Sequence, residues 1–215
     1  MPAATHHSLP SLHPCFPFPV CGTDVHHKRV GIVGLGRIGE AIARRFKGFD
    51  CSIAYTGRSG AKPEVEAALG GATWLPLPEL LSTSDIVVLI CPLTPETRGM
   101  IAAPQLALLK DGAVLINAAR GECVVQADLV AALAARPSLR AGLDVTDPEP
   151  LPLDHALLQL PNALVLPHIG SASMACREAM AMLTARNALA GLEGADMPAE
   201  VPETLAASAA WRAAP

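Results

Sequence analysis

Three polar side chains, each lying shortly after a short apolar run, are suited to acid–base chemistry on a small acid. They are Arg120, Glu149 and His168. A guanidinium can hold a carboxylate and polarise a ketone, an imidazole can donate a proton, and a carboxylate can stabilise the protonated imidazole. Reduction of a 2-keto acid requires these three groups. We therefore predict that Arg120, Glu149 and His168 form a catalytic set.

A glycine-rich loop offers a place for a dinucleotide. Residues 34–39 read GLGRIG and lie between an expected strand and an expected helix, which is the context that gives this pattern meaning. Gly34 permits a tight turn, Gly36 lets the backbone approach a pyrophosphate, and Gly39 lets helix and strand pack closely. With Arg37 and Ile38, these residues are expected to bind the cofactor at a helix N-terminus. The alternative is a glycine-rich turn without a ligand.

The segment after the second expected strand bears on the choice between NAD and NADP. Residues 55–60 read YTGRSG, and no acidic residue stands between Cys51 and Pro63. A carboxylate about 4 Å from a phosphate charge would cost on the order of 4 kcal/mol near a surface, whereas an arginine contributes with the opposite sign. Gly57, Arg58 and Ser59 are therefore expected to bind the 2′-phosphate of NADP(H). The alternative is that Arg58 is a solvated surface side chain.

Apolar runs that alternate with segments of helical periodicity position these residues. We expect strands at 29–33, 51–55, 72–75, 86–90, 113–117, 141–145 and 163–166, and helical segments at 38–47, 64–69, 78–82, 104–109, 126–135, 155–158 and 171–192. Continuous apolar strands joined by helices indicate a parallel sheet covered on both faces. The predicted fold is α/β, a Rossmann-like doubly wound parallel sheet.

The two ends of the chain differ from this pattern. Residues 1–28 hold five prolines and five of the seven histidines, and are expected to form a disordered or divergent leader. The Rossmann domain is expected at 29–170, a C-terminal helix at 171–194 and an irregular tail at 195–215. The leader histidines, together with Cys15 and Cys21, could ligate a metal, but their irregular spacing predicts no metal site.

Composition excludes several classes of function. The formal net charge of −4 argues against binding nucleic acid, which requires a basic face. No apolar run approaches the roughly 20 residues of a membrane span. The six cysteines form no CxxC pair, and the N-terminus lacks a secretory pattern, so we expect a cytoplasmic protein with reduced thiols.

Residues from about 28 to 200 resemble the D-2-hydroxy-acid dehydrogenases, and among them the glyoxylate/hydroxypyruvate reductases. The resemblance rests on VGIVGLGRIGEAIARRFKGF, YTGR, CPLTPETRG, LINAARGE, AGLDVTDPEPLP and LPHIGSAS, in that order. It implies that Arg120 binds substrate, that His168 is the proton donor and pairs with Glu149, and that His168 and Ser171 also contact substrate. YTGR matches the reductases that prefer NADPH.

The resemblance also implies further cofactor contacts. Asp144 would hold the nicotinamide end, and Ala118 and Gly170 would contact the nicotinamide half through their backbones. Cys91, Pro92 and Thr97 would line the adenine-ribose side. The activity implied is NADPH-dependent reduction of glyoxylate or hydroxypyruvate, small 2-keto acids, to glycolate or D-glycerate.

The resemblance fails before Val30, where the family has most of its substrate domain, a crossover helix and a dimerisation arm. That domain is expected to be largely missing here, which would expose the apolar face of the last helix and reduce activity. A homodimer is possible, although the arm that forms it in the family is expected to be missing. Two alternatives stay open, a catalytically impaired NADP-binding fragment or isoform and a minimal form that assembles with a partner. A corepressor of the C-terminal-binding type is disfavoured, because such proteins use NAD.

Overall fold

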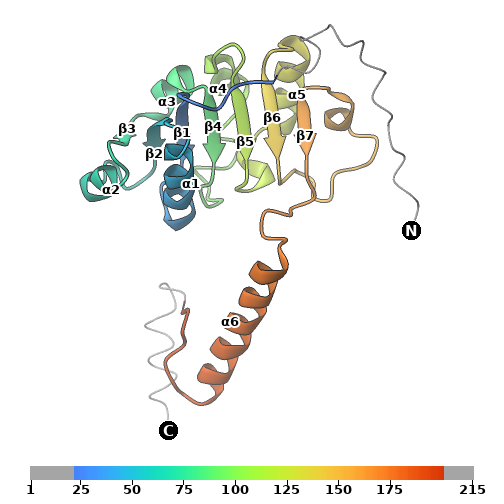
Figure 1. The fold of residues 1–215 in the computed structure, drawn as a ribbon. Coiled ribbons are helices and arrows are strands. Elements are labelled where there is room, and N and C mark those ends of the chain that lie inside the picture. Colours follow the sequence, from blue (N-terminus) through green and yellow to red (C-terminus); the bar gives the residue numbers. More distant parts are fainter. Residues whose placement is uncertain (1–21, 201–215) are drawn as a thin grey trace, which may run out of the picture.

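The structure is a computed structural model that describes residues 22–200, and its centre is a seven-stranded sheet (Figure 1). All pairings between neighbouring strands are parallel, and the strand order is β3-β2-β1-β4-β5-β6-β7. The strands are β1 (Arg29–Val33), β2 (Ser52–Thr56), β3 (Thr73–Trp74), β4 (Ile86–Leu89), β5 (Val114–Asn117), β6 (Arg140–Leu143) and β7 (Ala163–Val165). This confirms the predicted doubly wound α/β fold.

Helices connect the strands and cover the sheet, except for the last helix, which follows β7. They are α1 (Arg37–Lys47), α2 (Pro63–Ala68), α3 (Leu77–Thr83), α4 (Ala103–Leu108), α5 (Gln126–Ala135) and α6 (Met174–Leu192), with 3₁₀ turns η1 (Gly121–Cys123) and η2 (Ala156–Gln159). Helices α1 and α2 pack on one face of the sheet, whereas α3, α4 and α5 pack on the other (Figure 1). Successive side chains of β4 point to opposite faces of the sheet. Ile86 and Val88 therefore pack in the core on the α1 and α2 side, and Val87 and Leu89 pack in the core on the α3, α4 and α5 side.

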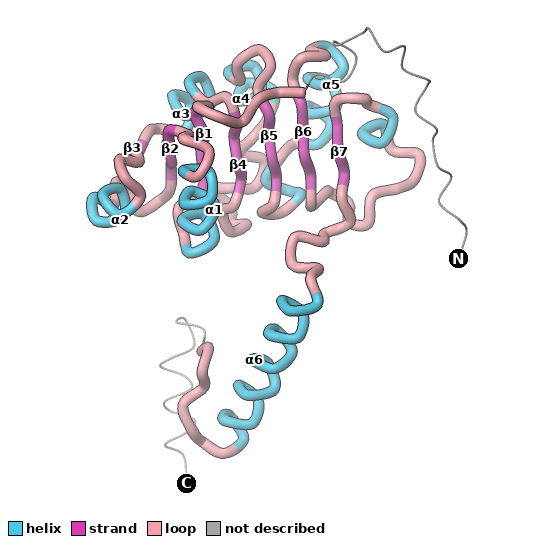
Figure 2. Tube along the Cα trace, viewed as in Figure 1, coloured by secondary structure: helices cyan, strands magenta, loops and turns pink. Residues whose placement is uncertain are grey.

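The apolar strands predicted a sheet covered on both faces, but one face is left partly uncovered at β7. No helix within residues 22–200 packs on the α1 side of β7, and Leu164 there is 61% exposed. Helix α6 stands clear of the sheet beyond the loop that follows β7 (Figure 2). Its apolar side chains Met174 and Leu189 are exposed, as the sequence led us to expect. The helix begins at Met174 rather than residue 171, because the Ser173 hydroxyl accepts a hydrogen bond from the Cys176 N–H.

The segment before β1 is attached to the domain, although it falls within the range assigned to the leader. The His27 N–H donates to the Phe49 carbonyl at 3.1 Å, and the Cys51 thiol donates to the Val25 carbonyl at 3.1 Å. Val25 also packs against the core beneath α1. The expectations for residues 1–21 and 201–215 lie outside the described residues. Within residues 22–200, no helix combines the length and the apolar composition needed to cross a bilayer.

Candidate functional site: a dinucleotide cleft and a histidine–glutamate pair

A cleft of about 500 Å³ opens at the carboxyl ends of β1, β2 and β4. The chain order reverses between β1 and β4, and ligands of open parallel sheets bind at such a switch point. The lining residues are Val33, Gly34, Leu35, Gly36, Tyr55, Thr56, Gly57, Arg58, Ser59, Gly60, Lys62, Leu77, Cys91, Pro92, Thr94, Glu96, Thr97 and Met100.

The glycine loop between β1 and α1 forms one wall of this cleft. Gly34 has φ +105°, a conformation that glycine alone adopts readily. A Cβ at Gly39 would lie 2.2 Å from the Gly34 carbonyl oxygen, so a side chain cannot fit where helix and strand meet. A Cβ at Gly36 would meet nothing within 4 Å, because Gly36 borders open space at the N-terminus of α1. The loop therefore leaves room for a ligand at Gly36.

Two cations line the opposite side of the cleft. Arg58 is exposed there, and the Lys62 ammonium donates a 2.5 Å hydrogen bond to the Leu35 carbonyl of the glycine loop. The buried Tyr55 holds this segment, because its hydroxyl donates to Glu66 at 2.7 Å and accepts from the Lys62 N–H at 2.6 Å. Burial and the bond to Glu66 raise the pKa of Tyr55, so the phenol stays neutral.

One carboxylate also lines the cleft. The Thr94 hydroxyl and the N–H of Glu96 itself, with a smaller contribution from the Arg58 charge, hold the pKa of Glu96 below its usual value. Glu96 is therefore ionised at neutral pH and attracts Arg58 across the cleft. A ligand phosphate would compete with Glu96 for that arginine.

The segment after β4 supplies an apolar wall. Burial, together with the neighbouring Cys123, raises the pKa of the Cys91 thiol to about 12, so Cys91 stays neutral. The Thr97 hydroxyl donates to the Pro92 carbonyl at 2.7 Å and accepts from the Thr94 N–H at 2.8 Å. Thr97 thus shapes the turn that presents Cys91 and Pro92 to the cleft.

His168 and Glu149 lie together at the same edge of the sheet, on the loops that follow β7 and β6. The His168 Nδ1 and the Glu149 Oε1 are 2.6 Å apart, and the two side chains are 49% and 41% exposed. His168 has φ +53°, which is uncommon for a residue other than glycine. Because Nδ1 is engaged by Glu149, Nε2 is the ring nitrogen that can exchange a proton with a ligand.

The Asp144 carboxylate at the end of β6 holds the backbone around this histidine. Its Oδ1 accepts from the Ile169 N–H at 2.7 Å, and its Oδ2 accepts from the Gly170 N–H at 2.9 Å. The His168 N–H also donates to the Asp144 carbonyl at 2.9 Å. Asp144 therefore positions His168, a contribution that was not predicted from the sequence.

Arg120 follows β5 on a loop fixed by a buried amide. The Asn117 Nδ2 donates to the Arg120 carbonyl at 2.9 Å, and the Asn117 Oδ1 accepts from the Ala119 N–H at 3.0 Å. A Cβ at Gly121 would lie 2.0 Å from the Thr146 carbonyl oxygen, so the loops after β5 and β6 touch. This contact holds Arg120 close to the loop that carries Glu149.

The structure thus places the sequence-predicted residues in two groups. Gly34, Gly36, Gly57, Arg58, Ser59, Cys91, Pro92 and Thr97 line the cleft. Arg37, Ile38 and Gly39 adjoin this group in the first turn of α1, where Gly39 packs against the Gly34 carbonyl and Ile38 is 64% exposed. Ala118, Asp144, Gly170 and Ser171 lie on the loops after β5, β6 and β7, next to the catalytic candidates. Lys62, Tyr55 and Asn117 were missed.

The fold and the cleft define a nucleotide-binding Rossmann domain. A model of the "D-isomer specific 2-hydroxyacid dehydrogenase, NAD binding domain" family matches residues 17–170. The chain belongs to this family. Its match to that domain shows that the expected cofactor is a nicotinamide dinucleotide, without distinguishing NAD from NADP.

Known proteins of this family share the fold and much of the sequence. The human glyoxylate reductase/hydroxypyruvate reductase is 49% identical over 186 residues, which are 86% of this chain and 56% of that protein. The glyoxylate reductase of Thermococcus onnurineus (strain NA1) is 49% identical over 189 residues, 88% of this chain and 54% of that protein. The crystal structure of TT0316 protein from Thermus thermophilus superposes with a TM-score of 0.79 at 44% identity, covering 87% of this chain and 58% of that chain. The chain therefore spans little more than half the length of these relatives.

Proposed function

We propose that this chain binds NADPH and serves the reduction of glyoxylate or hydroxypyruvate to glycolate or D-glycerate. The observation that carries the proposal is the 2.6 Å pair of His168 and Glu149, at the sheet edge that also holds the dinucleotide cleft. Relatives that carry these substrates in their names support the choice of acid. The nicotinamide, when bound, supplies the hydride.

The chain's own residues perform the remaining tasks in this proposal. Arg120 binds the substrate carboxylate and polarises the ketone, because a guanidinium forms strong charge-assisted hydrogen bonds. His168 Nε2 donates the proton to the ketone oxygen, and Glu149 stabilises the charge on the ring through Nδ1. Asp144 and Gly170 keep the His168 turn in place, and Ser171, which follows this turn, is assigned to the substrate.

The preference for NADPH is proposed from the charges of the cleft. Arg58 and Lys62 line it, and no acidic residue occurs between Cys51 and Pro63 to accept a ribose hydroxyl. Arg58 would exchange its attraction to Glu96 for a 2′-phosphate, which is a stronger partner because of its higher charge. Lys62 would add a second positive charge on the same side.

A second function is favoured by the exposure of the catalytic pair. The side chains of His168 and Glu149 are nearly half exposed, and water weakens the electrostatic effects on which catalysis depends. A chain that binds NADPH without turnover is therefore the alternative.

The test follows NADPH oxidation by absorbance with glyoxylate and hydroxypyruvate, for the wild type, His168→Ala and Arg177→Ala. Arg177 lies on the exposed helix α6 and serves as a control for a charged surface position. Loss of a general acid lowers turnover by about 10²–10⁴-fold. We expect turnover to fall by this amount in His168→Ala while its NADPH affinity is retained, and we expect the turnover of Arg177→Ala to equal that of the wild type. Equal turnover of wild type and His168→Ala would contradict the catalytic role, and binding without any turnover would favour the alternative.

A further inference from the structure

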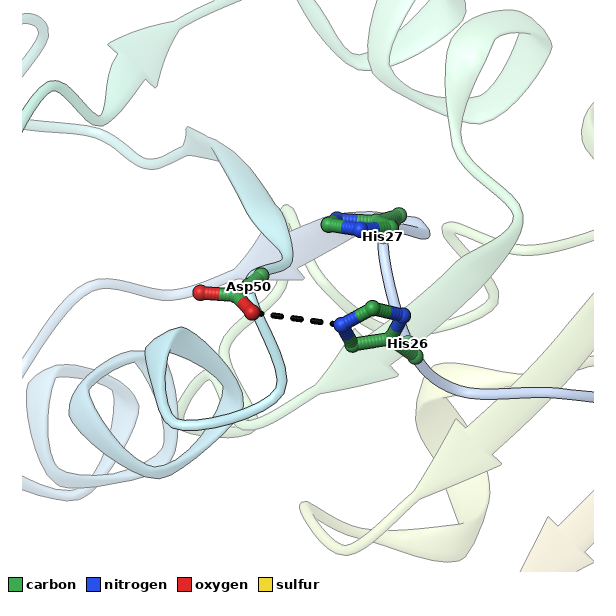
Figure 3. A group of neighbouring side chains, drawn as sticks. All are labelled: His26, His27 and Asp50. Atoms are coloured by element: carbon green, nitrogen blue, oxygen red, sulfur yellow. Dashed lines mark hydrogen bonds and ion pairs between the residues drawn. The ribbon is translucent and has the colours of Figure 1, made fainter.

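A second group of polar side chains lies at the amino ends of β1 and β2, at the edge of the sheet away from the dinucleotide cleft. His26 and His27 precede β1, and Asp50 lies in the turn between α1 and β2 (Figure 3). Each residue offers one ligand atom, and these atoms all lie within 4.8 Å of one another. We propose that His26, His27 and Asp50 bind a divalent transition metal ion of the zinc class, which fastens the segment before β1 to the α1–β2 turn.

The backbone brings the two neighbouring histidines to one side. Successive side chains of an extended chain point in opposite directions. His27 instead has φ +60°, and the ring centroids of His26 and His27 are only 3.6 Å apart. Asp50 has φ +55°, so that both residues facing His26 have left-handed backbones. Within residues 22–200, the third non-glycine residue with positive φ is the proposed proton donor His168.

The spacing suits a zinc ion. Bonds of about 2.0–2.1 Å in tetrahedral geometry separate two ligand atoms by about 3.3 Å. The His26 Nε2 and the Asp50 Oδ2 are 3.2 Å apart, so this pair already has the required separation (Figure 3). The ligand atom of the exposed His27 lies within 4.8 Å of the other two, so metal binding would draw this ring closer, and water would complete the coordination.

The chemistry and the charge of the group also suit a cation. Two imidazoles and a carboxylate are ligands that zinc, nickel and copper ions accept, whereas calcium and magnesium prefer oxygen. A second carboxylate is close, because the Asp24 Oδ1 accepts a 3.2 Å hydrogen bond from the His26 N–H. The two carboxylates together favour a positive ion.

The attachment of this segment gives the metal a structural role. The His27 N–H donates to the Phe49 carbonyl, and the Ser52 N–H donates to the Lys28 carbonyl at 3.1 Å, so two backbone hydrogen bonds already join the segments. A metal bound by side chains of both segments would strengthen the junction at the start of the β1–β2 pairing. The five residues of β1 span about 17 Å, which separates this group from the cofactor loop. The proposal is therefore independent of the proposed enzymatic function.

The test is titration of Zn²⁺ into the metal-free full chain by calorimetry, with Co²⁺ as a visible probe of tetrahedral geometry. The variants are His27→Asn and Asp50→Asn, because asparagine tolerates positive φ and is a weaker ligand. A control variant keeps the three residues and replaces the other candidate ligands near the N-terminus, His6, His7, His13, Cys15 and Cys21.

We expect one Zn²⁺ per chain and an affinity that falls at least about tenfold in His27→Asn and in Asp50→Asn, since even outer partners of a metal site contribute that much. Zn²⁺ should raise the unfolding temperature of the wild type and of the control variant, but not of the two site variants. Absence of Zn²⁺ binding by the wild type would overturn the proposal, as would binding that disappears in the control variant and persists in Asp50→Asn. Unfolding temperatures without metal show whether each variant is folded.

Discussion

Two glycines of the cofactor loop should respond to the same added methyl group with different losses of stability. Gly36→Ala places a Cβ where no atom lies within 4 Å, and Gly36 has an extended backbone that alanine can adopt. Alanine is a poorer N-cap than glycine, so we expect a loss of unfolding free energy of less than about 1 kcal/mol. Gly39→Ala places a Cβ 2.2 Å from the Gly34 carbonyl oxygen, about 1.2 Å inside ordinary contact. Overpacking of this kind costs roughly 1–3 kcal/mol.

Gly36→Ala, the variant with the smaller expected loss of stability, should nevertheless bind NADPH more weakly than the wild type. In Gly36→Ala the methyl group would occupy the space into which a pyrophosphate fits, and a steric cost of about 1.4 kcal/mol or more weakens binding at least tenfold. Urea denaturation followed by circular dichroism measures stability, and a fluorescence titration with NADPH measures binding. Near wild-type NADPH affinity in Gly36→Ala would refute the placement of the pyrophosphate at this turn. Wild-type stability of Gly39→Ala would refute the close approach of α1 to β1.

Three further predictions concern charged groups. Arg58→Ala should weaken NADPH binding by roughly 10–150-fold in the fluorescence titration, because a hydrogen bond to a charged group contributes about 1.5–3 kcal/mol. The NADH affinity should stay nearly unchanged. Arg44→Ala, on the exposed side of α1, is the control. Glu96→Gln should tighten NADPH binding by less than about fivefold, because Arg58 loses a competing partner, and weaker binding would contradict that competition. Burial alone would raise the pKa of Asp85, but hydrogen bonds from the Arg29 N–H and the Lys110 ammonium outweigh it and lower the pKa. The stabilisation by the Asp85 carboxylate is therefore present above the unfolded-state pKa of about 3.9 and is lost as pH falls through the lower folded-state value. Urea denaturation should show that Asp85→Asn lowers the unfolding free energy by about 1 kcal/mol at pH 7, and that this loss shrinks below pH 4. A loss that stays constant with pH would contradict an origin in the charge of Asp85.

The sheet was predictable because its strands are buried and apolar. Residues 29–33 are β1 within the predicted bounds, and 126–135 are α5 within the predicted bounds. Other boundaries moved by one to three residues, and at Ser173 before α6 the reason is a side-chain cap. The fourteen strand and helix segments expected from the sequence all occur, and for those that pack on the sheet local periodicity agrees with burial.

The cofactor loop was predictable for a different reason. Glycines at 34 and 39 are required by backbone conformation and close approach, and these requirements are local to the strand–turn–helix unit. Arg58 was likewise predicted from its position just after β2. Arg37 and Ile38 were grouped with the loop because they begin α1, and their contact with the cofactor stays a prediction.

The supporting contacts could not be predicted because they join residues far apart in sequence. Asp144 meets Ile169 and Gly170 only when β6 and β7 are neighbours in the sheet. Lys62 reaches the Leu35 carbonyl because the chain after β2 returns past the glycine loop. His26 meets Asp50 only through the pairing of β1 with β2, so the irregular spacing of the histidines concealed this group.

The cleft at the β1–β4 switch point is proposed to be an NADPH site. Its most direct test is a pair of fluorescence titrations of the wild-type chain, one with NADPH and one with NADH. We expect saturable binding of one NADPH per chain, at least about tenfold tighter than NADH, since a charge-assisted contact with the 2′-phosphate contributes about 1.5 kcal/mol or more. Tighter binding of NADH, or no binding of either cofactor by the folded chain, would contradict it.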